Sequence, residues 1–513
     1  MENKVFIEIE NFGPISYSKL DLNDLTFFIG PNNSGKSYAA MLIHLLLKLF
    51  EEIPSFRRFF YSHSNIQSDI NFYIDDFVED HKVKRRKFFE FDAGQLIESI
   101  SGFLERNSET LDKLEVVEIP EELIERLHKN IIKSIKQFIL QNLEDELKRI
   151  FACTLKELTK FGEECFKISI MSEEVDIIFE CIDDKIISKK FKIKIPKIFI
   201  SKKLLKRDQK YLLRIESVSF QVDDNVKVPK KMDFDKSAVA IFETLFPLLI
   251  IGLRKSLSLI DSKNFYYLPA TRAGLIQGQK AISSAFYRLS SRALIEPINI
   301  PTLSGIISDF LVNIIEIRRK KGIYQELVEF IEINLTRGKI EYISDENGGA
   351  SEIMYITTDG EIPLYRASSM ISELAPIVLY FKHIIIRKCF LIIEEPEAHL
   401  HPDAQRFFAQ FVVKLIRSGF KVLITTHSDF LILQINNFIR LTEKSKKFRR
   451  EGIYDEDDFI DYREVNTFLF EYKDDFGGIS TDKLETSIYG IKEDHFAKIT
   501  DQLYGESSEL DRK

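Results

Sequence analysis

Eight consecutive residues near the N-terminus constrain the fold of this 513-residue chain more than any other feature. They fit the phosphate-binding pattern G-x-x-x-x-G-K-[ST] at every fixed position: Gly30, Pro31, Asn32, Asn33, Ser34, Gly35, Lys36 and Ser37. Apolar residues 25–29 precede the pattern and predict a strand, and residues 38–43 follow it with the composition of a helix. This order points backbone N–H groups and a helix N-terminus at one spot. The sequence therefore predicts an ATP site, with Lys36 on the β- and γ-phosphates and the Ser37 hydroxyl on Mg²⁺.

Composition and charge are those of an ordinary globular protein. Hydrophobic residues make up 44% and charged residues 30% of the chain, and the formal net charge is −8. This charge argues against binding DNA through the field of the whole molecule, so any DNA contact would need a local basic patch. The longest apolar stretch, residues 245–251, is too short to span a bilayer. The chain also starts without a basic region followed by an apolar one, so we expect a soluble, cytoplasmic protein with no membrane partner.

Changes in hydrophobic period indicate four segments. Residues 1–50 carry strands, the phosphate-binding pattern and a helix. Residues 51–235 form an insert that is mostly helix-like to about residue 165. The insert then alternates with period two to about residue 222, which is typical of an antiparallel sheet with one solvated face. Residues 236–440 begin with a helical stretch to about residue 258 and hold further motifs, and residues 441–513 form an extension. We predict an α/β fold whose sheet is assembled from both ends of the chain.

Two adjacent carboxylates follow a short apolar run in the third segment. Residues 389–393 predict a buried parallel strand, and Glu394 and Glu395 stand at its carboxyl end, where ligands collect in an open α/β sheet. We expect Glu394 to hold Mg²⁺ through water and Glu395 to orient and deprotonate the attacking water. The alternative is a strand that simply runs into an acidic loop.

A second apolar run ends in a histidine. Residues 402–417 predict a helix with one apolar face, and Gly419 ends it. Residues 422–424 predict another buried strand, and His427 follows at its tip. We expect His427 to sense the γ-phosphate and the attacking water. A histidine that only caps the next helix is the alternative.

The phosphate-binding pattern, Leu-Ile-Ile-Glu-Glu-Pro-Glu-Ala-His-Leu-His-Pro at 391–402 and Ile-Thr-Thr-His-Ser at 424–428, in this order, resemble the ABC-type ATPases of the SMC/RecF/OLD group. Most similar are the RecF-like AAA ATPases found in prokaryotic anti-phage defence systems. The resemblance covers the first ~50 residues and about 265–435 well. It implies an ABC-type P-loop ATPase head with ATP and Mg²⁺ as cofactors. Residues 267–274 also resemble a motif of this group, and Arg272 is expected to approach phosphate or the opposing subunit.

The segment that would act across a dimer departs from the family pattern. In this group a serine before a helix N-terminus caps the γ-phosphate bound to the other subunit. The matching segment is 366–374, where Ser368 or Ser369 can cap a helix and offer a hydroxyl and N–H groups to phosphate. The usual paired glycines are absent, and Met370 stands where backbone access is wanted. An ordinary helix cap is the alternative.

The sequence argues against a metal cluster and a nuclease domain. Glu397, His399 and His401 are expected to shape the turn and the dimer contact rather than bind metal. The four cysteines form no C-x-x-C pair and are expected to be reduced thiols. OLD nucleases carry a Toprim domain after the ATPase, and only about 85 residues follow His427 here, without the paired Asp motif. An intrinsic nuclease is therefore not expected.

The resemblance implies an ATP-dependent switch that forms a homodimer or higher oligomer. Its role would be the ATPase sensor of a defence module that controls a separate effector such as a nuclease. The second hypothesis is a RecF/SMC-like ATPase acting on DNA in repair or chromosome maintenance, and the third is a scaffold with slowly hydrolysed, structural ATP. A transporter head is the least expected, because the chain lacks a glycine-containing signature and has a long insert. Four basic runs bear on DNA binding, although each alone is more typical of a solvated face: residues 82–87, 202–207, 318–321 and 444–450.

Overall fold

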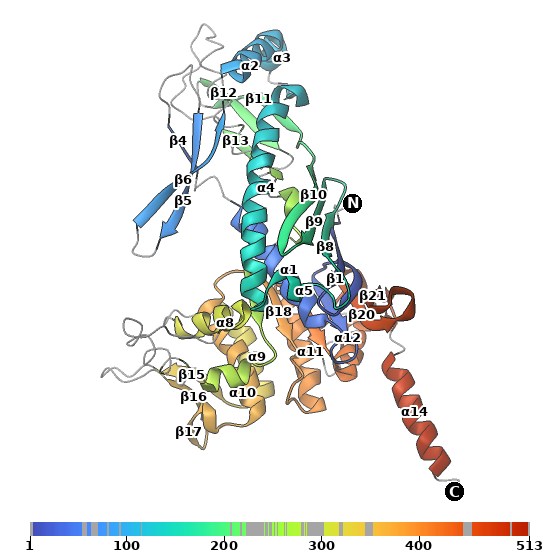
Figure 1. Cartoon of the computed structure of the whole chain (residues 1–513). Helices are drawn as coiled ribbons and strands as arrows, with labels where there is room; N and C mark the ends of the chain where they lie inside the picture. The colour runs from blue at the N-terminus through green and yellow to red at the C-terminus, as the bar shows by residue number, and fades with distance from the viewer. Residues whose placement is uncertain are drawn as a thin grey trace, which may run out of the picture.

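The computed structural model describes most of the chain, as drawn in Figure 1. The described residues are 4–53, 59–62, 70–78, 82–91, 94–113, 115–205, 208–215, 218–221, separate positions between 241 and 284 (241, 245, 249–250, 252–253, 255–260, 262, 264–278, 282 and 284), 302–317, 322–343, 352–444, 454–492 and 495–510. In Figure 1 a base is built around a large sheet, the helix α4 rises from it, and α14 extends from the base towards the C-terminus.

An 11-stranded sheet organises the base, in the order β10-β9-β8-β1-β2-β21-β20-β3-β19-β18-β14. The five strands from β20 to β14 run parallel to one another. Because β1–β3 come from the start of the chain and β14 and β18–β21 from its later part, both ends build this sheet, and the predicted α/β class is confirmed. The strands span Phe6–Phe12 (β1), Ile15–Asp21 (β2), Leu25–Ile29 (β3), Phe166–Met171 (β8), Val175–Ile182 (β9), Lys185–Ile193 (β10), Phe265–Leu268 (β14), Phe390–Glu394 (β18), Lys421–Thr426 (β19), Val465–Lys473 (β20) and Gly478–Lys483 (β21).

The parallel strands are covered on both faces, as their unbroken apolar sequences predict. All five residues of β3 and of β18 are buried. Alternate side chains of β3 enter opposite cores: Phe28 packs with residues of α1 (Lys36–Glu52), and Phe27 packs with α11 (Pro402–Arg417) and α12 (Asp429–Leu441). Each large side chain buried in this way stabilises the fold by about 1.5–3 kcal/mol relative to exposure.

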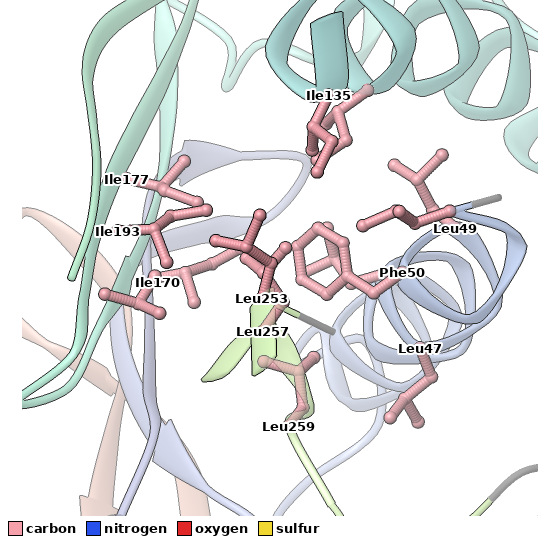
Figure 2. Packing of buried hydrophobic residues seen from close by; sticks show 14 of the residues in the cluster. Leu47, Leu49, Phe50, Ile135, Ile170, Ile177, Ile193, Leu253, Leu257 and Leu259 are labelled. Carbon is pink, nitrogen blue, oxygen red and sulfur yellow. The ribbon is translucent and has the colours of Figure 1, made fainter. Parts of the chain in front are cut away.

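The insert shares one of these cores with the phosphate-binding helix. Its longest element is α4 (Glu121–Phe151), a 31-residue helix that would be about 46 Å long at 1.5 Å per residue. Figure 2 shows Ile135 of α4 near Leu49 and Phe50 of α1, with Ile170 and Ile177 of the sheet on the other side. The insert and α1 therefore share one continuous hydrophobic core. The buried stripe of α4 consists of Ile124, Leu127, His128, Ile131, Ile135, Ile139, Leu143, Leu147 and Ile150.

The insert contains more strand than its sequence suggested. Residues 59–91, expected to be helix-like, include three antiparallel strands, because aromatic and β-branched residues recur there and favour a pleated backbone. The antiparallel character predicted for 166–222 is confirmed, but the region divides in two: β8–β10 extend the main sheet through β1, and β11–β13 form another sheet with β7. The remaining strands of these sheets are Phe59–Ser62 (β4), Ile70–Val78 (β5), Lys82–Phe91 (β6), Val117–Glu118 (β7), Ile198–Leu205 (β11), Asp208–Ile215 (β12) and Val218–Gln221 (β13).

A smaller lobe beside β14 presents the helix α10 (Ser369–Leu379). A three-stranded antiparallel sheet, β15-β16-β17, leads into it. The helix expected over 236–258 lies mostly outside the described residues. Within the described part of the chain, no helix is both long and apolar enough to cross a bilayer. The other elements are Gly94–Arg106 (α2), Ser108–Asp112 (α3), Leu155–Leu158 (α5), Gly305–Ile315 (α8), Gln325–Ile331 (α9), Lys339–Ile343 (β15), Glu352–Thr357 (β16), Gly360–Pro363 (β17), Thr486–Ser487 (β22), Gly490–Ile491 (β23) and His495–Leu510 (α14).

Candidate active site

Three predicted motifs meet at one edge of the sheet. Strand β19 lies between β3 and β18, and all three are parallel, so their carboxyl ends share an edge. The loop 30–35 follows β3, the pair Glu394 and Glu395 ends β18, and His427 follows β19. This edge is where an open α/β sheet binds ligands. The spacing between the motifs in the sequence gave no direct sign of this proximity, which depends on strand order.

The two glycines of the phosphate-binding pattern are required by the backbone conformation and the close packing at their positions. Gly30 has φ 137°, and a Cβ there would lie 2.1 Å from the carbonyl oxygen of Phe470. Gly35 has φ 82°, and its Cβ would meet the side chain of Ile15. These positions tolerate no side chain without a shift of the neighbouring backbone or core. Phe470 belongs to β20, so a strand from beyond residue 440 supports the loop, a contact that sequence reasoning missed.

Lys36 curls over the loop and is held there by neutral oxygens. Its Nζ donates to the carbonyl oxygens of Gly30 (3.0 Å) and Pro31 (2.7 Å) and to Oγ of Ser34 (3.2 Å). Burial lowers the pKa of Lys36 to about 8, although Glu395 and Glu397 act in the opposite direction. An ammonium group with only neutral direct partners is suited to an anionic ligand, and a triphosphate on the exposed loop supplies one.

Glu394 has the acceptor capacity that a Mg²⁺ site needs. Its side chain is buried; Oε2 accepts a hydrogen bond from the backbone N–H of Ala270 at 3.1 Å, while Oε1 is buried with no hydrogen-bond partner among the described residues. A buried carboxylate oxygen without a partner calls for an ion or water. The hydroxyl of Tyr267 is buried beside Glu394, and burial, followed by this neighbouring carboxylate, raises the pKa of Tyr267 well above the usual value. The chemistry of Glu394 therefore fits the predicted metal site, while the roles of Ser37 and of a bridging water stay predictions.

Glu395 presents an ionised carboxylate to the site. His427 Nε2 lies 3.5 Å from its Oε1, and this contact is the main reason that the pKa of Glu395 is lowered, against the effect of burial. The Glu395 backbone has φ 40°, in the left-handed region, and its N–H donates to the carbonyl oxygen of Thr425 at 2.9 Å. A strained backbone at a partly exposed carboxylate is typical of functional positions. The arrangement can activate a water molecule.

Glu397 joins the loops that follow β18 and β19. Its Oε1 accepts hydrogen bonds from Oγ1 of Thr426 (2.7 Å) and from the backbone N–H of His427 (2.6 Å). Burial raises the pKa of Glu397. His399 is exposed with φ 61°, and His401 caps α11 through Nδ1, which accepts from the N–H of Asp403 at 3.3 Å. These three side chains shape the turn, and the described residues contain no group of three or more His, Cys, Asp and Glu side chains that could hold a metal ion.

Arg272 lies in a different place from the one we expected. Its side chain is 0% exposed, so it does not reach a surface that an opposing subunit could touch. The guanidinium faces backbone carbonyl oxygens, those of Glu394 (Nη1, 2.7 Å) and Glu395 (Nη2, 3.5 Å) among them, and forms an ion pair with Glu373. In this structure the guanidinium therefore contacts the peptide groups of Glu394 and Glu395.

Ser368 and Ser369 lie at the exposed N-terminus of α10. Oγ of Ser368 accepts a hydrogen bond from the N–H of Ile371 at 3.4 Å, so Ser368 caps the helix as predicted. Both serines are exposed, which leaves this end of α10 accessible to a ligand from outside. The action of these serines on the nucleotide of another subunit stays a prediction.

The basic runs are only partly described. Residues 82–87 lie on β6 and 202–205 on β11. Residues 318–321 and 445–450 lie outside the described residues.

A family model described as AAA ATPase domain matches residues 5–432. Among solved structures, the chain is similar to the SmcHead bound to the C-winged helix domain of ScpA, with 11% identity, a TM-score of 0.35 and coverage of 94% of this chain and 97% of that chain. It is also similar to the SMC head domain from Thermotoga maritima (10% identity, TM-score 0.31, 94% and 100% covered) and to the recombination mediator protein RecF-ATPrS of the RecFOR pathway (12%, 0.34, 94% and 98%). No curated protein matches. At these TM-scores the structural likenesses support no functional statement.

Proposed function

The chain belongs to the AAA ATPase domain family, and from this premise we propose that it is an ATP-hydrolysing switch of the SMC/RecF type. The observation that carries the proposal is the pair Glu395 and His427, 3.5 Å apart at the sheet edge that also holds Lys36. A protein that only stores a nucleotide needs the phosphate-binding loop alone. A carboxylate that stays ionised beside a histidine can act as a general base and activate water for hydrolysis.

Each residue has a role that follows from its position. The loop N–H groups and Lys36 bind the β- and γ-phosphates. Ser37 and, through water, Glu394 hold Mg²⁺, which neutralises charge on the phosphates. Glu395 accepts a proton from the attacking water, and His427 orients Glu395 and contacts the γ-phosphate. Glu397 fixes His427 through its backbone N–H, so the distance between base and sensor is set before the nucleotide arrives.

The switch would require a second copy of the chain. The exposed serines at the N-terminus of α10 offer N–H groups and hydroxyls to the γ-phosphate of another subunit, which gives an ATP-dependent homodimer or higher oligomer. Met370 stands in place of a glycine there, so we expect a weaker closed state than a glycine-containing signature allows. Hydrolysis then returns the assembly to the open state.

The biological role in this proposal is that of a cytoplasmic ATPase sensor in an anti-phage defence module, with a separate effector such as a nuclease. It is supported by the resemblance of residues 391–402 and 424–428 to ATPases of such systems. The effector would be held in one state of the assembly and released in the other. This role is an analogy between families, and the site supports only its ATPase component.

Mass photometry of Glu395→Gln with and without ATP tests the switch, together with phosphate release by the unmodified protein. We expect ATP to convert Glu395→Gln into a dimer or larger assembly and hydrolysis to be abolished. Lys36→Ala is the matched control, because it should neither bind ATP nor assemble. Unchanged hydrolysis in Glu395→Gln would show that another group activates water. If Glu395→Gln loses hydrolysis but does not assemble with ATP, the protein is an ATPase and the proposed switch is wrong.

A RecF/SMC-like ATPase that acts on DNA is the second candidate. The observation in its favour is that the basic run 82–87 lies on β6 in the insert rather than at the ATP site. This candidate predicts ATP-dependent binding of duplex DNA by the purified protein, with an affinity that falls steeply as salt increases. Binding that is absent at about 50 mM salt would exclude it.

A further inference from the structure

Arg272 is the largest fully buried side chain among the described residues, and its hydrogen bonds go to the end of β18, to α10 and to Pro269 of its own loop. Nη1 donates to the carbonyl oxygens of Glu394 (2.7 Å) and Pro269 (3.2 Å), and Nη2 to that of Glu395 (3.5 Å). Nε donates to the carbonyl oxygen of Glu373 at 3.1 Å and lies 3.1 Å from its Oε2. One guanidinium thus bridges the end of β18 and the helix α10.

A buried charge is costly unless its partners are well placed. Arg272 meets this condition because its N–H groups donate to backbone carbonyl oxygens and the carboxylate of Glu373 lies beside it. Glu373, Glu397, Glu394 and Glu395 all act on it electrostatically, with Glu373 the strongest of the four. One of these contacts reaches the carbonyl oxygen of Glu395, whose backbone has a left-handed φ of 40° and whose N–H donates to Thr425.

The other end of the bridge lies one helical turn from the exposed serines. Glu373 follows Ser369 by four residues on α10, so the two share one face of the helix. A second contact joins the segment that carries Arg272 to α10: Nε2 of Gln277 donates to Oγ of Ser372 at 3.0 Å. These contacts connect α10 through Arg272 to the peptide of Glu395.

We propose that Arg272 is a positioning residue that couples the site acting on a partner's nucleotide, at the N-terminus of α10, to the water-activating Glu395 of its own subunit. The inference rests on the proposed function, since it assumes that α10 engages phosphate from another copy. It assigns to Arg272 no contact with ATP. Engagement of α10 in one subunit would change the alignment of Glu395 in that same subunit, so the two ATP sites of a dimer would hydrolyse in a coupled way.

Arg272→Lys tests the positioning role, because lysine keeps the charge and loses the planar fork that reaches two segments at once. We expect kcat for ATP hydrolysis to fall about 10- to 100-fold, as for a misplaced catalytic group, with KM changed less than about twofold. Glu373→Gln is a second variant that weakens the ion pair from the α10 side, and we expect kcat to fall in the same direction. Arg417→Lys, which changes a surface pair with Glu464, is the control. Equal kcat in Arg272→Lys and Arg417→Lys would overturn the proposal.

The coupling itself is measured in the Glu395→Gln background, where hydrolysis does not interfere. We expect Arg272→Lys to raise the ATP concentration needed for half-maximal assembly about tenfold, while the affinity for a fluorescent ATP analogue at the monomer stays within about twofold. If Glu395→Gln alone does not assemble, the proposed switch fails while the kcat effect of Arg272→Lys still stands. If Glu395→Gln assembles and Arg272→Lys changes neither assembly nor kcat, this inference fails and the switch remains. Thermal unfolding of each variant identifies a loss caused by misfolding, and in that case Glu373→Gln decides.

Discussion

Glu397 accepts a hydrogen bond from the backbone N–H of His427 at 2.6 Å, and this contact makes the loops after β18 and β19 one rigid unit. Thr426 donates its hydroxyl to the same carboxylate oxygen at 2.7 Å. Glu395, the proposed base, lies two residues before Glu397, so one half-buried carboxylate joins the loop that carries Glu395 to the loop that carries His427. We therefore expect Glu397 to align the proposed base and the histidine rather than to act on the reacting atoms.

Replacing Glu397 by Gln therefore affects turnover more than binding. The amide offers one acceptor oxygen, and its NH₂ group would face two donors if it turned the other way. We expect kcat to fall about tenfold or more while the affinity for ATP stays within about threefold. Single-turnover phosphate release and nucleotide binding measure the two quantities. Glu464→Gln, at a surface pair with Arg417, is the matched control, and a loss of ATP affinity equal to the loss of kcat would contradict the alignment role.

His427→Ala shifts the pH dependence of hydrolysis. The His427 contact is the largest cause of the lowered pKa of Glu395, and Glu395 must be ionised to accept a proton. Without His427 the pKa of Glu395 rises, so the acidic limb of kcat moves to higher pH. A kcat–pH profile from about pH 3.5 to 8 measures this shift, because the limb of the unmodified protein lies below the ordinary pKa of a glutamate. His401→Ala, which removes only a helix cap, should leave the limb in place, and an unmoved limb in His427→Ala would assign water activation to another group.

The motifs could be predicted from sequence because their chemistry is local. Over a few residues, a glycine-rich loop between a strand and a helix has one favourable structure. The same holds for two carboxylates after an apolar run. The loop and helix start at 30–37, the strand at 390–394 and the helix at 402–417 have the predicted structures. Glu397 was identified, but its partner was not, since the contact with His427 spans 30 residues.

Arg272 and Phe470 show why the rest could not be predicted. The pattern at 267–274 indicated an arginine near the site, yet its direction depends on α10, about a hundred residues further on. Phe470 approaches Gly30 because β20 pairs in parallel with β3, and strand order across 440 residues has no local signal. The strands of residues 59–91 were missed because aromatic and charged residues there fit a helical period as well as a strand period.

The affinity for ATP should fall in alkaline solution because of Lys36. Burial holds the pKa of Lys36 at about 8 in the protein without nucleotide, whereas a bound triphosphate favours the charged form. The affinity is therefore highest below pH 8, and it falls by about tenfold per pH unit above this value until the pKa of the bound state is reached. Calorimetric titrations at pH 7 to 10 in buffers of different ionisation enthalpy would show proton uptake on binding. Lys36→Arg keeps its charge, so its affinity should be independent of pH over this range.

Gly30→Ala should damage the loop more than its unusual φ alone explains. A Cβ at Gly30 would lie 2.1 Å from the carbonyl oxygen of Phe470, so β20 or the loop must move. Gly162 provides the control: its φ is 90°, and a Cβ there would have nothing within 4 Å. We expect Gly162→Ala to cost about 1 kcal/mol of stability and to retain ATP binding, and Gly30→Ala to lose ATP binding by more than tenfold. Equal effects of both variants would mean that the contact with Phe470 is unimportant.

Asp309 ties the long helix of the insert to the phosphate-binding helix, and its removal should loosen both. Its carboxylate pairs with Arg149 of α4 (2.8 Å) and with Lys48 of α1 (3.1 Å), at the wall of a cavity of about 280 Å³ that His44 also lines. Burial acts to raise the pKa of Asp309, but the Arg149 hydrogen bond and Lys48 outweigh it and the pKa is lowered.

A carboxylate with a lowered pKa in the folded state stabilises the fold above its unfolded pKa, and that contribution disappears as the pH falls through the folded value. We expect Asp309→Asn to lower the free energy of unfolding by about 1 kcal/mol near pH 7, since the group is partly exposed, and by less as the pH falls below about 4. Urea unfolding of both proteins at pH 7 and pH 3 measures the difference. Glu125→Gln, at the exposed pair with Lys129, should change stability by less than about 0.5 kcal/mol. A difference between Asp309→Asn and the unmodified protein that stays the same at both pH values would show that the side chain contributes through packing rather than charge.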